Sequence, residues 1–278
     1  MNFKHFIITR FNLPLGKAGM VDKNNTATQD LKWLTTRYSL FDSFCFPSIC
    51  NQTNKNFLWL CFFDSNTPEE FKSKNNKYHK LFENFIPIYL TEEEARNFLD
   101  IVNKEIQNRS QNYDYILTTR MDNDDSLAYN AIESIQNFTQ ECNIPSTYII
   151  NPLNGVQYYE EYNCSIMVKW ETSHFLTMSA PKIKNDNIYS INHTDVKLKY
   201  NVKQLKSKNP LWMEVCHKTN LVNDVHLKWI FCPIKNNILS YFYVNSNHSN
   251  IKTSLFHFKF AYLYPKMLKK IANKIYGK

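Results

Sequence analysis

Apolar and polar positions in the first 125 residues fall into blocks that predict a regular order of elements. Short apolar runs bounded by polar residues predict strands, and a continuous run such as 57–63 is typical of a strand buried on both faces. These runs cover residues 5–9, 57–63, 85–89 and 113–118. Helices are predicted between them, over about 30–48, from 67 onward and over 91–106. This order predicts an α/β domain with a mostly parallel sheet flanked by helices.

Local signals mark where these helices begin and end. Thr67-Pro68-Glu69-Glu70 supplies an N-cap residue, a proline suited to the first helical position, and acids in the first turn. Thr91 and Glu94 have the spacing of a capping box. Pro47 lies where we expect the first helix to kink or end.

The second half of the chain is less regular. Residues 126–140 predict a further helix, and 148–150, 165–168 and 212–217 predict strands. Residues 182–209 are polar and rich in Lys and Asn, and predict a long surface loop with one short helix. The polar run 245–250 resembles a linker. The predicted boundary therefore separates a main domain, residues 1–245, from a basic tail, residues 246–278.

Composition removes several classes of protein. The 278 residues are 43% hydrophobic, enough for one large domain with a core. Glycine is rare, with four residues, and neither GxGxxG nor GxxxxGK[ST] occurs. The sequence therefore lacks the usual signals for dinucleotide binding by a Rossmann domain and for P-loop NTPases.

The net charge of +8 suits a phosphorylated ligand, an anionic lipid surface or nucleic acid. Aromatic residues are not interleaved with the lysines as they are in a base-stacking platform, so we expect no nucleic-acid partner. Part of the positive charge lies in the tail, at Lys266, Lys269, Lys270, Lys274 and Lys278.

Cysteine usage points to a reducing compartment. The seven cysteines are scattered and form no CxxC pair, which argues against a disulfide framework or a zinc site. The first residues lack the apolar region of a signal peptide, and no apolar stretch reaches the roughly 18 residues of a spanning helix. We therefore expect a cytoplasmic protein, soluble or bound at the inner face of the cell membrane.

The run from Thr118 to Asp125 carries the most chemistry. Asp122, Asp124 and Asp125 follow a predicted strand directly. Carboxylates this close repel one another unless they are solvated or share a cation, and hard oxygen ligands suit Mg²⁺ or Mn²⁺ beside a substrate phosphate. The alternative is a solvated loop in which Asp125 and Ser126 cap the helix predicted to follow.

Several pieces of the chain, in this order, carry a resemblance to a known family. They are 5–12; Arg37 with Leu40-Phe41; 47–53; 56–64 with Thr67-Pro68; 118–125; Asn154-Gly155; and 212–220. Together they resemble glycosyltransferases of the GT-A fold, a Rossmann-like α/β fold, and more closely a bacterial rhamnosyltransferase family. The resemblance covers about the first 225 residues and leaves the tail outside.

This resemblance implies a metal-dependent glycosyltransferase. Such an enzyme moves a sugar from a nucleotide-sugar donor to a glycan or lipid-linked glycan acceptor, here in the synthesis of bacterial surface polysaccharide. Residues 1–125 would form the nucleotide-binding half and residues 126–245 the acceptor half. The sugar, the acceptor and the choice between inversion and retention stay open.

The resemblance also assigns roles to residues. Metal ligands would be Asp122, Asp124 and His217, holding Mn²⁺ or Mg²⁺. Alternatives remain for three of the site residues: Asp64 could simply begin a turn, Arg120 could pair with a neighbouring acid, and His217 could be an ordinary hydrogen-bonded residue. The residues expected to bind the donor are Thr9, Arg10, Phe11, Asp64, Arg120 and Asp122.

The sequence leaves the catalytic base open among three acids. Inverting transfer needs a carboxylate that takes the proton of the acceptor hydroxyl. Glu214 is the candidate, and Glu171 and Asp195 compete with it. A retaining reaction would not need such a base in the same way.

The tail permits two interpretations. Its amphipathic, basic sequence suits an anionic membrane near a lipid-linked acceptor, or a helix packed on the main domain with solvated lysines. Pro265 interrupts the segment and shortens any helix that binds a membrane. Two other functions also stay open: a metal-dependent phosphodiesterase using the same acids, and a non-catalytic membrane-surface protein.

Overall fold

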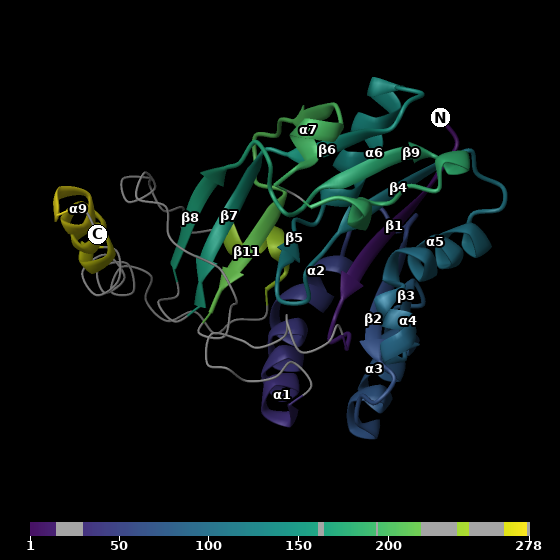
Figure 1. The fold of residues 1–278 in the computed structure, drawn as a ribbon, viewed down its shortest axis with the longest axis horizontal. Helices are drawn as coiled ribbons and strands as arrows, with labels where there is room; N and C mark the ends of the chain where they lie inside the picture. The colour runs from purple at the N-terminus through teal and green to yellow at the C-terminus, as the bar shows by residue number, and fades with distance from the viewer. Residues whose placement is uncertain (15–29, 161–163, 193, 218–237, 245–263, 277–278) are drawn as a thin grey trace.

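The computed structural model describes residues 1–14, 30–160, 164–192, 194–217, 238–244 and 264–276, and it contains two sheets (Figure 1). The larger sheet has seven strands, in the order β3 (Phe85–Leu90), β2 (Leu58–Asp64), β1 (Phe3–Arg10), β4 (Tyr115–Arg120), β9 (Thr177–Pro181), β6 (Tyr148–Pro152) and β10 (Val202–Leu205). The smaller sheet has the order β5 (Ser126–Leu127), β11 (Trp212–Cys216), β7 (Asn154–Tyr159) and β8 (Cys164–Lys169).

Most of the helices lie between these strands along the chain, and α9 follows the last strand. The longer ones are α1 (Leu31–Leu40), α3 (Glu69–Leu81), α5 (Phe98–Arg109), α6 (Ala131–Cys142) and α9 (Tyr264–Tyr276). The shorter ones are a π-helix (Phe41–Cys45), α2 (Phe46–Cys50), α4 (Glu92–Arg96), α7 (Val196–Lys199) and the 3₁₀ turns Lys182–Lys184, Ile188–Ser190 and Ile238–Phe242.

Most strand pairs in the larger sheet are parallel. β1 lies between β2 and β4 and is parallel to both, and β2 is parallel to β3. The exception is β9, which is antiparallel to β4 and to β6. This sheet with its flanking helices confirms the predicted α/β class, including the strand that delivers the acidic run.

Alternation along β1 sends successive side chains to opposite faces of the sheet. Ile7 belongs to the core cluster that includes α1, α3 and α6, together with Trp59 and Phe63 of β2. Phe6 and Ile8 belong to the cluster that includes α5. The end of β1 therefore places Arg10 on the α5 side of the sheet, where its guanidinium lies over the ring of Phe98.

The predicted helix at 126–140 starts later than the sequence suggested. Ser126–Leu127 is a short strand, β5, that pairs antiparallel with β11, and α6 begins at Ala131 with Asn130 as its N-cap residue. Asp125 does not cap a helix, because its carboxylate accepts the backbone N–H of Val215 instead. The local sequence predicts that Asp125 caps a helix, but a backbone N–H of the distant strand β11 bonds to its carboxylate instead.

The prediction of a surface loop over residues 182–209 was wrong in part. This segment contains β10, which pairs parallel with β6 at the edge of the larger sheet, and three short helical turns, at Lys182–Lys184, Ile188–Ser190 and Val196–Lys199. The four residues of β10 include a lysine and a glutamine, so no apolar run marks the strand. Strands β7 and β9 were also missed.

Two prolines lie in the first turns of helices. Pro47 lies in the first turn of α2, and the π-helix before it connects α1 to α2 without ending the helical segment. Pro265 lies in the first turn of α9, where proline costs no helical hydrogen bond, so it begins that helix. The capping box of Thr91 and Glu94 is present as predicted.

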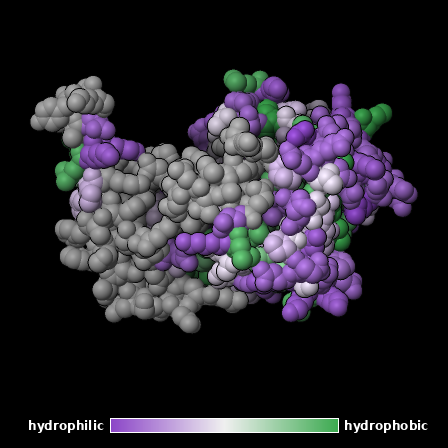
Figure 2. Space-filling view, turned by 60° about the horizontal axis from the view of Figure 1, so that its bottom comes forward, coloured by the Kyte–Doolittle hydropathy of each residue, from purple (hydrophilic) through white to green (hydrophobic). Residues whose placement is uncertain are grey.

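Helix α9 lies at one end of the molecule, beyond β8, and presents hydrophilic and hydrophobic residues close together (Figures 1 and 2). Polar side chains dominate the opposite end in Figure 2, where α3, α4 and α5 lie. The linker predicted at 245–250 lies outside the described residues. Within the described part of the chain, no helix combines the length and apolar character needed to cross a bilayer.

Candidate metal and donor site

The acidic segment lies at the junction of the two sheets. It follows β4 of the larger sheet and leads directly into β5 of the smaller one. The backbone N–H of Met121 still bonds to the carbonyl oxygen of Ile8, at 3.1 Å, so the segment leaves the larger sheet at Asp122. The side chain of Asn123 then donates to the carbonyl oxygen of Phe11, at 3.1 Å. These bonds hold the four residues 122–125 at the carboxyl edge of the parallel strands.

Asp124 is buried in an ion pair. Its carboxylate contacts the guanidinium of Arg37 from α1 and lies 2.8 Å from Nε2 of His217. Burial opposes ionisation of this carboxyl group, but Arg37 and His217 outweigh that effect and hold the pKa of Asp124 well below its usual range. Arg37 also donates to the side chain of Asn123 at 3.2 Å, which fixes the segment to α1.

Asp125 joins the acidic segment to the smaller sheet. One carboxylate oxygen accepts the N–H of Val215 at 2.9 Å, and the other lies 3.0 Å from Nε2 of His174, in the connection between β8 and β9. Burial raises the pKa of Asp125 to about 7. Burial opposes the positive charge of His174, but its hydrogen bond to Asp125 raises the pKa of the imidazole to about 9.

A candidate metal site consists of Asp122, Asp125 and His174. Each offers one ligand atom, and the three atoms lie within 4.8 Å of one another. Two carboxylates and one imidazole fit a divalent ion such as Mn²⁺, and the half-exposed Asp122 leaves room for water or phosphate oxygens. Ligation needs neutral imidazole, so a bound ion would displace the proton of His174.

This set overlaps the predicted ligands only at Asp122. Asp124 and His217 are in contact with each other, and Asp124 is also engaged by Arg37. The prediction that Asp124 and His217 ligate the metal therefore competes with a positioning role for both. His174 was missed by sequence reasoning, because a single histidine between two strands carries no spacing that marks a ligand.

Two predicted donor-binding arginines lie close together on the α5 side of the sheet. The guanidinium carbon of Arg10 lies 4.9 Å from the ring centroid of Tyr189, and that of Arg120 lies 5.5 Å from the same centroid. Nε of Arg120 is 3.6 Å from the carboxylate of Asp122, and that carboxylate raises the pKa of Arg120. Arg120 therefore has the acidic neighbour that the alternative interpretation expected.

Three other predicted donor residues have partners inside the protein. Thr9 accepts a hydrogen bond from the indole of Trp59 at 2.9 Å. The ring of Phe11 packs in the core, 4.6 Å from that of Tyr38, and is not an open stacking surface. Asp64 accepts the N–H of Asn66 at 2.8 Å, which is the turn-initiating arrangement.

The candidate base Glu214 is buried on β11 and accepts a hydrogen bond from Gln157 of β7. Burial raises the pKa of Glu214, and the neighbouring charge of His174 opposes this shift. The two competitors are at the surface: Glu171 pairs with Lys197 at 2.7 Å, and Asp195 accepts a hydrogen bond from Thr194. Glu214 itself lies close to the acidic cluster, where it interacts with His174, Asp124 and Asp122.

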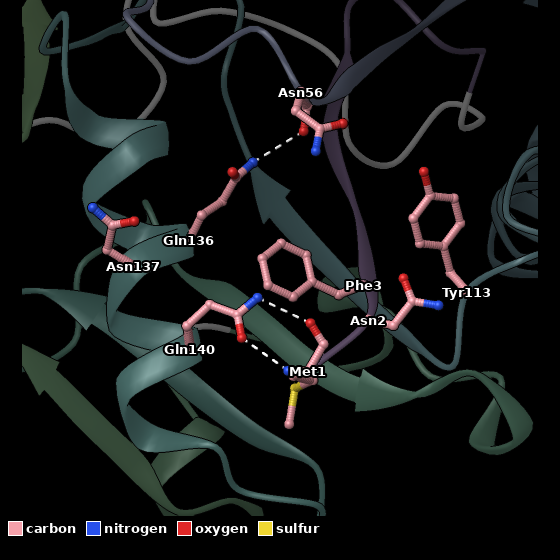
Figure 3. A pocket seen from close by; sticks show the side chains of 8 residues that line it. All are labelled: Met1, Asn2, Phe3, Asn56, Tyr113, Gln136, Asn137 and Gln140. Atoms are coloured by element: carbon pink, nitrogen blue, oxygen red, sulfur yellow. Dashed lines mark hydrogen bonds between the residues drawn. The ribbon is translucent and has the colours of Figure 1, made fainter.

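A separate pocket lies at the other end of β1, beside the amino terminus (Figure 3). Gln140 donates to the carbonyl oxygen of Met1 and accepts from its amino group, and Gln136 donates to the carbonyl oxygen of Asn56. The eight residues of β1 separate this pocket from Arg10 by roughly 25 Å at the usual rise per residue. Much of its lining is paired internally and it lies far from the acids, so we assign it no part in the reaction.

The fold and this arrangement define a class of protein. Carboxylates, imidazoles and guanidiniums gather at the carboxyl edge of a mostly parallel sheet, where open α/β sheets bind their ligands. Residues 4–228 match the family model described as "Putative rhamnosyl transferase". The chain belongs to this family of glycosyltransferases.

Comparisons beyond the family are distant. The crystal structure of a "putative nucleotide-diphospho-sugar transferase" from Desulfovibrio desulfuricans is 9% identical, with a TM-score of 0.34. The match covers 73% of this chain and 78% of that protein's chain. S. aureus TarS is 11% identical, with a TM-score of 0.38, covering 94% of this chain and 44% of its own. Among curated proteins, none matches the chain.

Proposed function

We propose that this protein is a metal-dependent glycosyltransferase that takes its sugar from a nucleotide-sugar donor. The observation that carries the proposal is the cluster of Asp122, Asp125 and His174, whose ligand atoms lie within 4.8 Å of one another in a member of a glycosyltransferase family. Arg120 and Arg10, close to this cluster, offer two cations for the donor diphosphate. The sugar class, hexosyl or deoxyhexosyl, follows the name of the family alone.

Each group of residues in the site has its own role in this proposal. Asp122, Asp125 and His174 would hold Mn²⁺ or Mg²⁺, and such an ion neutralises the charge of a departing diphosphate. Arg10 and Arg120 bind the phosphate oxygens. Glu214 takes the proton of the acceptor hydroxyl if the reaction inverts configuration, since burial has raised its pKa toward the range that suits a base.

A thermal-shift screen tests the proposal. The intact protein is melted with UDP, GDP, dTDP and CDP, each with and without Mn²⁺. We expect one nucleoside diphosphate to raise the melting temperature, and to raise it further with Mn²⁺, because ligands that bind the folded state stabilise it. A protein that responds to none of the eight conditions would overturn the proposal. Hydrolysis of a phosphodiester, with every nucleotide sugar left intact, would instead support the phosphodiesterase.

We further propose that α9 brings the enzyme to the inner face of the cell membrane, where a lipid-linked glycan would be its acceptor. Leu268 and Ile271 are exposed beside Lys269 and Lys270, and the segment Tyr264–Tyr276 contains no acidic residue. Apolar and cationic side chains together suit an anionic lipid surface. Residues 1–245 would then be the catalytic domain, with its acceptor half at 126–245, and residues 246–278 the membrane-binding tail of an enzyme of surface polysaccharide synthesis.

Vesicle sedimentation tests this second proposal. We expect binding to vesicles that contain phosphatidylglycerol and not to pure phosphatidylcholine, and loss of binding in a Lys269→Glu, Lys270→Glu variant. The matched control is Lys72→Glu, Lys80→Glu on α3, which changes the net charge equally at the other end of the molecule. Equal loss in both variants would show that net charge, and not α9, attracts the protein to the membrane.

A further inference from the structure

We infer that Tyr189 is a positioning residue that holds Arg10 and Arg120 as a paired site for the donor diphosphate, an inference that rests on the proposed function. Tyr189 lies in the 3₁₀ turn Ile188–Ser190, within the segment that the sequence predicted to be a surface loop. Arg10 and Arg120 end two neighbouring strands, β1 and β4. One aromatic side chain thus connects three segments that are far apart in the sequence.

The position of the Tyr189 ring is fixed from several sides. Its hydroxyl donates to the carbonyl oxygen of Ile8 at 3.2 Å, and its ring meets that of Phe98 edge to face, with centroids 5.3 Å apart. The backbone N–H of Tyr189 donates to the side chain of Asn187 at 2.9 Å, and Asn187 in turn donates to Asn103 of α5. The ring is therefore a rigid surface on which guanidiniums can rest.

The charges around the ring point to an anionic ligand. Two guanidiniums lie within 6 Å of one ring centroid, where the face of an aromatic ring attracts cations. Arg120 has Asp122 as its only ion-pair partner, and Arg10 has none, within the described part of the chain. Nε of Arg120 is buried and also has no hydrogen-bond partner among the described residues. Like charges held this close favour an anion that satisfies both.

A diphosphate fits this arrangement better than a single carboxylate. Guanidiniums bind phosphate oxygens through paired N–H groups, and two of them can engage two phosphate groups. Asp122 belongs to both the Arg120 ion pair and the candidate metal set. An ion that draws Asp122 toward itself would leave Arg120 to the phosphate, so cation and diphosphate would bind cooperatively.

The test measures binding of nucleoside diphosphates to the whole protein by calorimetry. The screen of UDP, GDP, dTDP and CDP first identifies which one the wild type binds, and its nucleoside without phosphates serves as a second probe. We expect Tyr189→Leu to weaken binding of the diphosphate about tenfold, the order expected for losing two cation–π contacts. Binding of the nucleoside should stay unchanged, because the ring acts only on the phosphates.

Two variants keep the result interpretable. Tyr189→Phe keeps the ring and should restore the affinity to within about threefold, although it loses the bond to Ile8. Tyr113→Leu is the matched control, because Tyr113 lies under Lys4, at 5.8 Å, near the other end of the sheet. Equal weakening of diphosphate and nucleoside by Tyr189→Leu, or no weakening at all, would overturn this inference. A wild type that binds none of the four diphosphates would refute the proposed function itself.

Discussion

Val215 donates its backbone N–H to the carboxylate of Asp125 at 2.9 Å. This bond joins the acidic segment at the end of β4 to β11, an inner strand of the smaller sheet. Asp125 therefore has a structural role at Val215 and a candidate role as a metal ligand, because its other oxygen faces His174 in the candidate metal site. Substitutions at Asp125 can separate its structural role from its proposed role as a metal ligand.

Replacement of Asp125 should show this separation. Asp125→Ala leaves the Val215 N–H and the His174 imidazole without their partner, which we expect to cost about 2 kcal/mol of unfolding free energy. Asp125→Asn keeps an oxygen for Val215 and should cost less, but it removes a carboxylate ligand. Thermal melts with and without Mn²⁺ measure both effects. If the Asn variant keeps the full response to Mn²⁺, Asp125 is not a ligand.

The two histidines offer a direct choice between metal sites. We expect His174→Gln to abolish the stabilisation by Mn²⁺, because it removes one of the three clustered ligand atoms. His217→Gln should lower the melting temperature through its lost contact with Asp124 but keep the response to Mn²⁺. The reverse pattern would establish the ligand set predicted from sequence, Asp122, Asp124 and His217.

The buried pair of Arg37 and Asp124 should behave as a unit. Arg37→Met leaves a buried carboxylate with less compensation, and we expect a loss of about 3–5 kcal/mol. The double variant Arg37→Met, Asp124→Leu should lose less than the sum of the single changes. Urea unfolding measures all three.

The exposed pair of Arg96 and Glu92 supplies the control for that cycle. These side chains are 69% and 58% exposed, so Arg96→Met should cost no more than about 0.5 kcal/mol. If the losses of unfolding free energy at Arg37 and Asp124 are additive, the predicted coupling is wrong, because the two side chains then act independently.

His5 should make the fold sensitive to acid. Its Nδ1 accepts a hydrogen bond from Gln136, and Nε2 lies 2.7 Å from Thr119. Gln136 cannot reverse its role easily, because its amide oxygen accepts from Asn54 and its nitrogen also donates to Asn56. A proton on Nδ1 would therefore meet an N–H group. Burial and the charge of Lys4 lower the pKa of His5 from 6.5 to about 3.

The sign of the effect follows from this lowered pKa. Below pH 6.5 the unfolded chain takes up a proton that the folded protein excludes, so stability falls as the pH falls from 6.5 toward 3. We expect His5 alone to lower the free energy of unfolding by about 2 kcal/mol between pH 7.5 and pH 5. Urea unfolding of wild type and His5→Gln over that range should show a flatter dependence in the variant. Parallel curves would exclude His5 as the source.

The first half of the fold could be predicted from sequence because its signals are local. The apolar run at 57–63 and the capping box at Thr91 and Glu94 determine their own elements with little help from distant residues. The α/β class follows from the same region, whereas the family match extends over residues 4–228. The acidic run was therefore placed correctly at the end of β4.

The detail of the site could not be predicted because distant partners decide it. Asp125 and Ser126 have the sequence of a helix start, but β11, some 90 residues later, pairs with Ser126 and supplies the Val215 N–H. His174 and Tyr189 come from connections without any regular pattern. The packing of the two sheets decides that Asp124 contacts Arg37 and that Asp125 faces His174. The spacing of residues in the sequence does not predict this packing.

The antiparallel contact of β5 with β11 also has a consequence for synthesis. Strands β1 to β4 lie within the first 120 residues, so most of their sheet can form while the chain is still emerging from the ribosome. The Asp125 carboxylate receives its partner only once Val215 has been made. A nascent chain would thus carry several paired strands beside an incomplete candidate metal site until β11 has been synthesised.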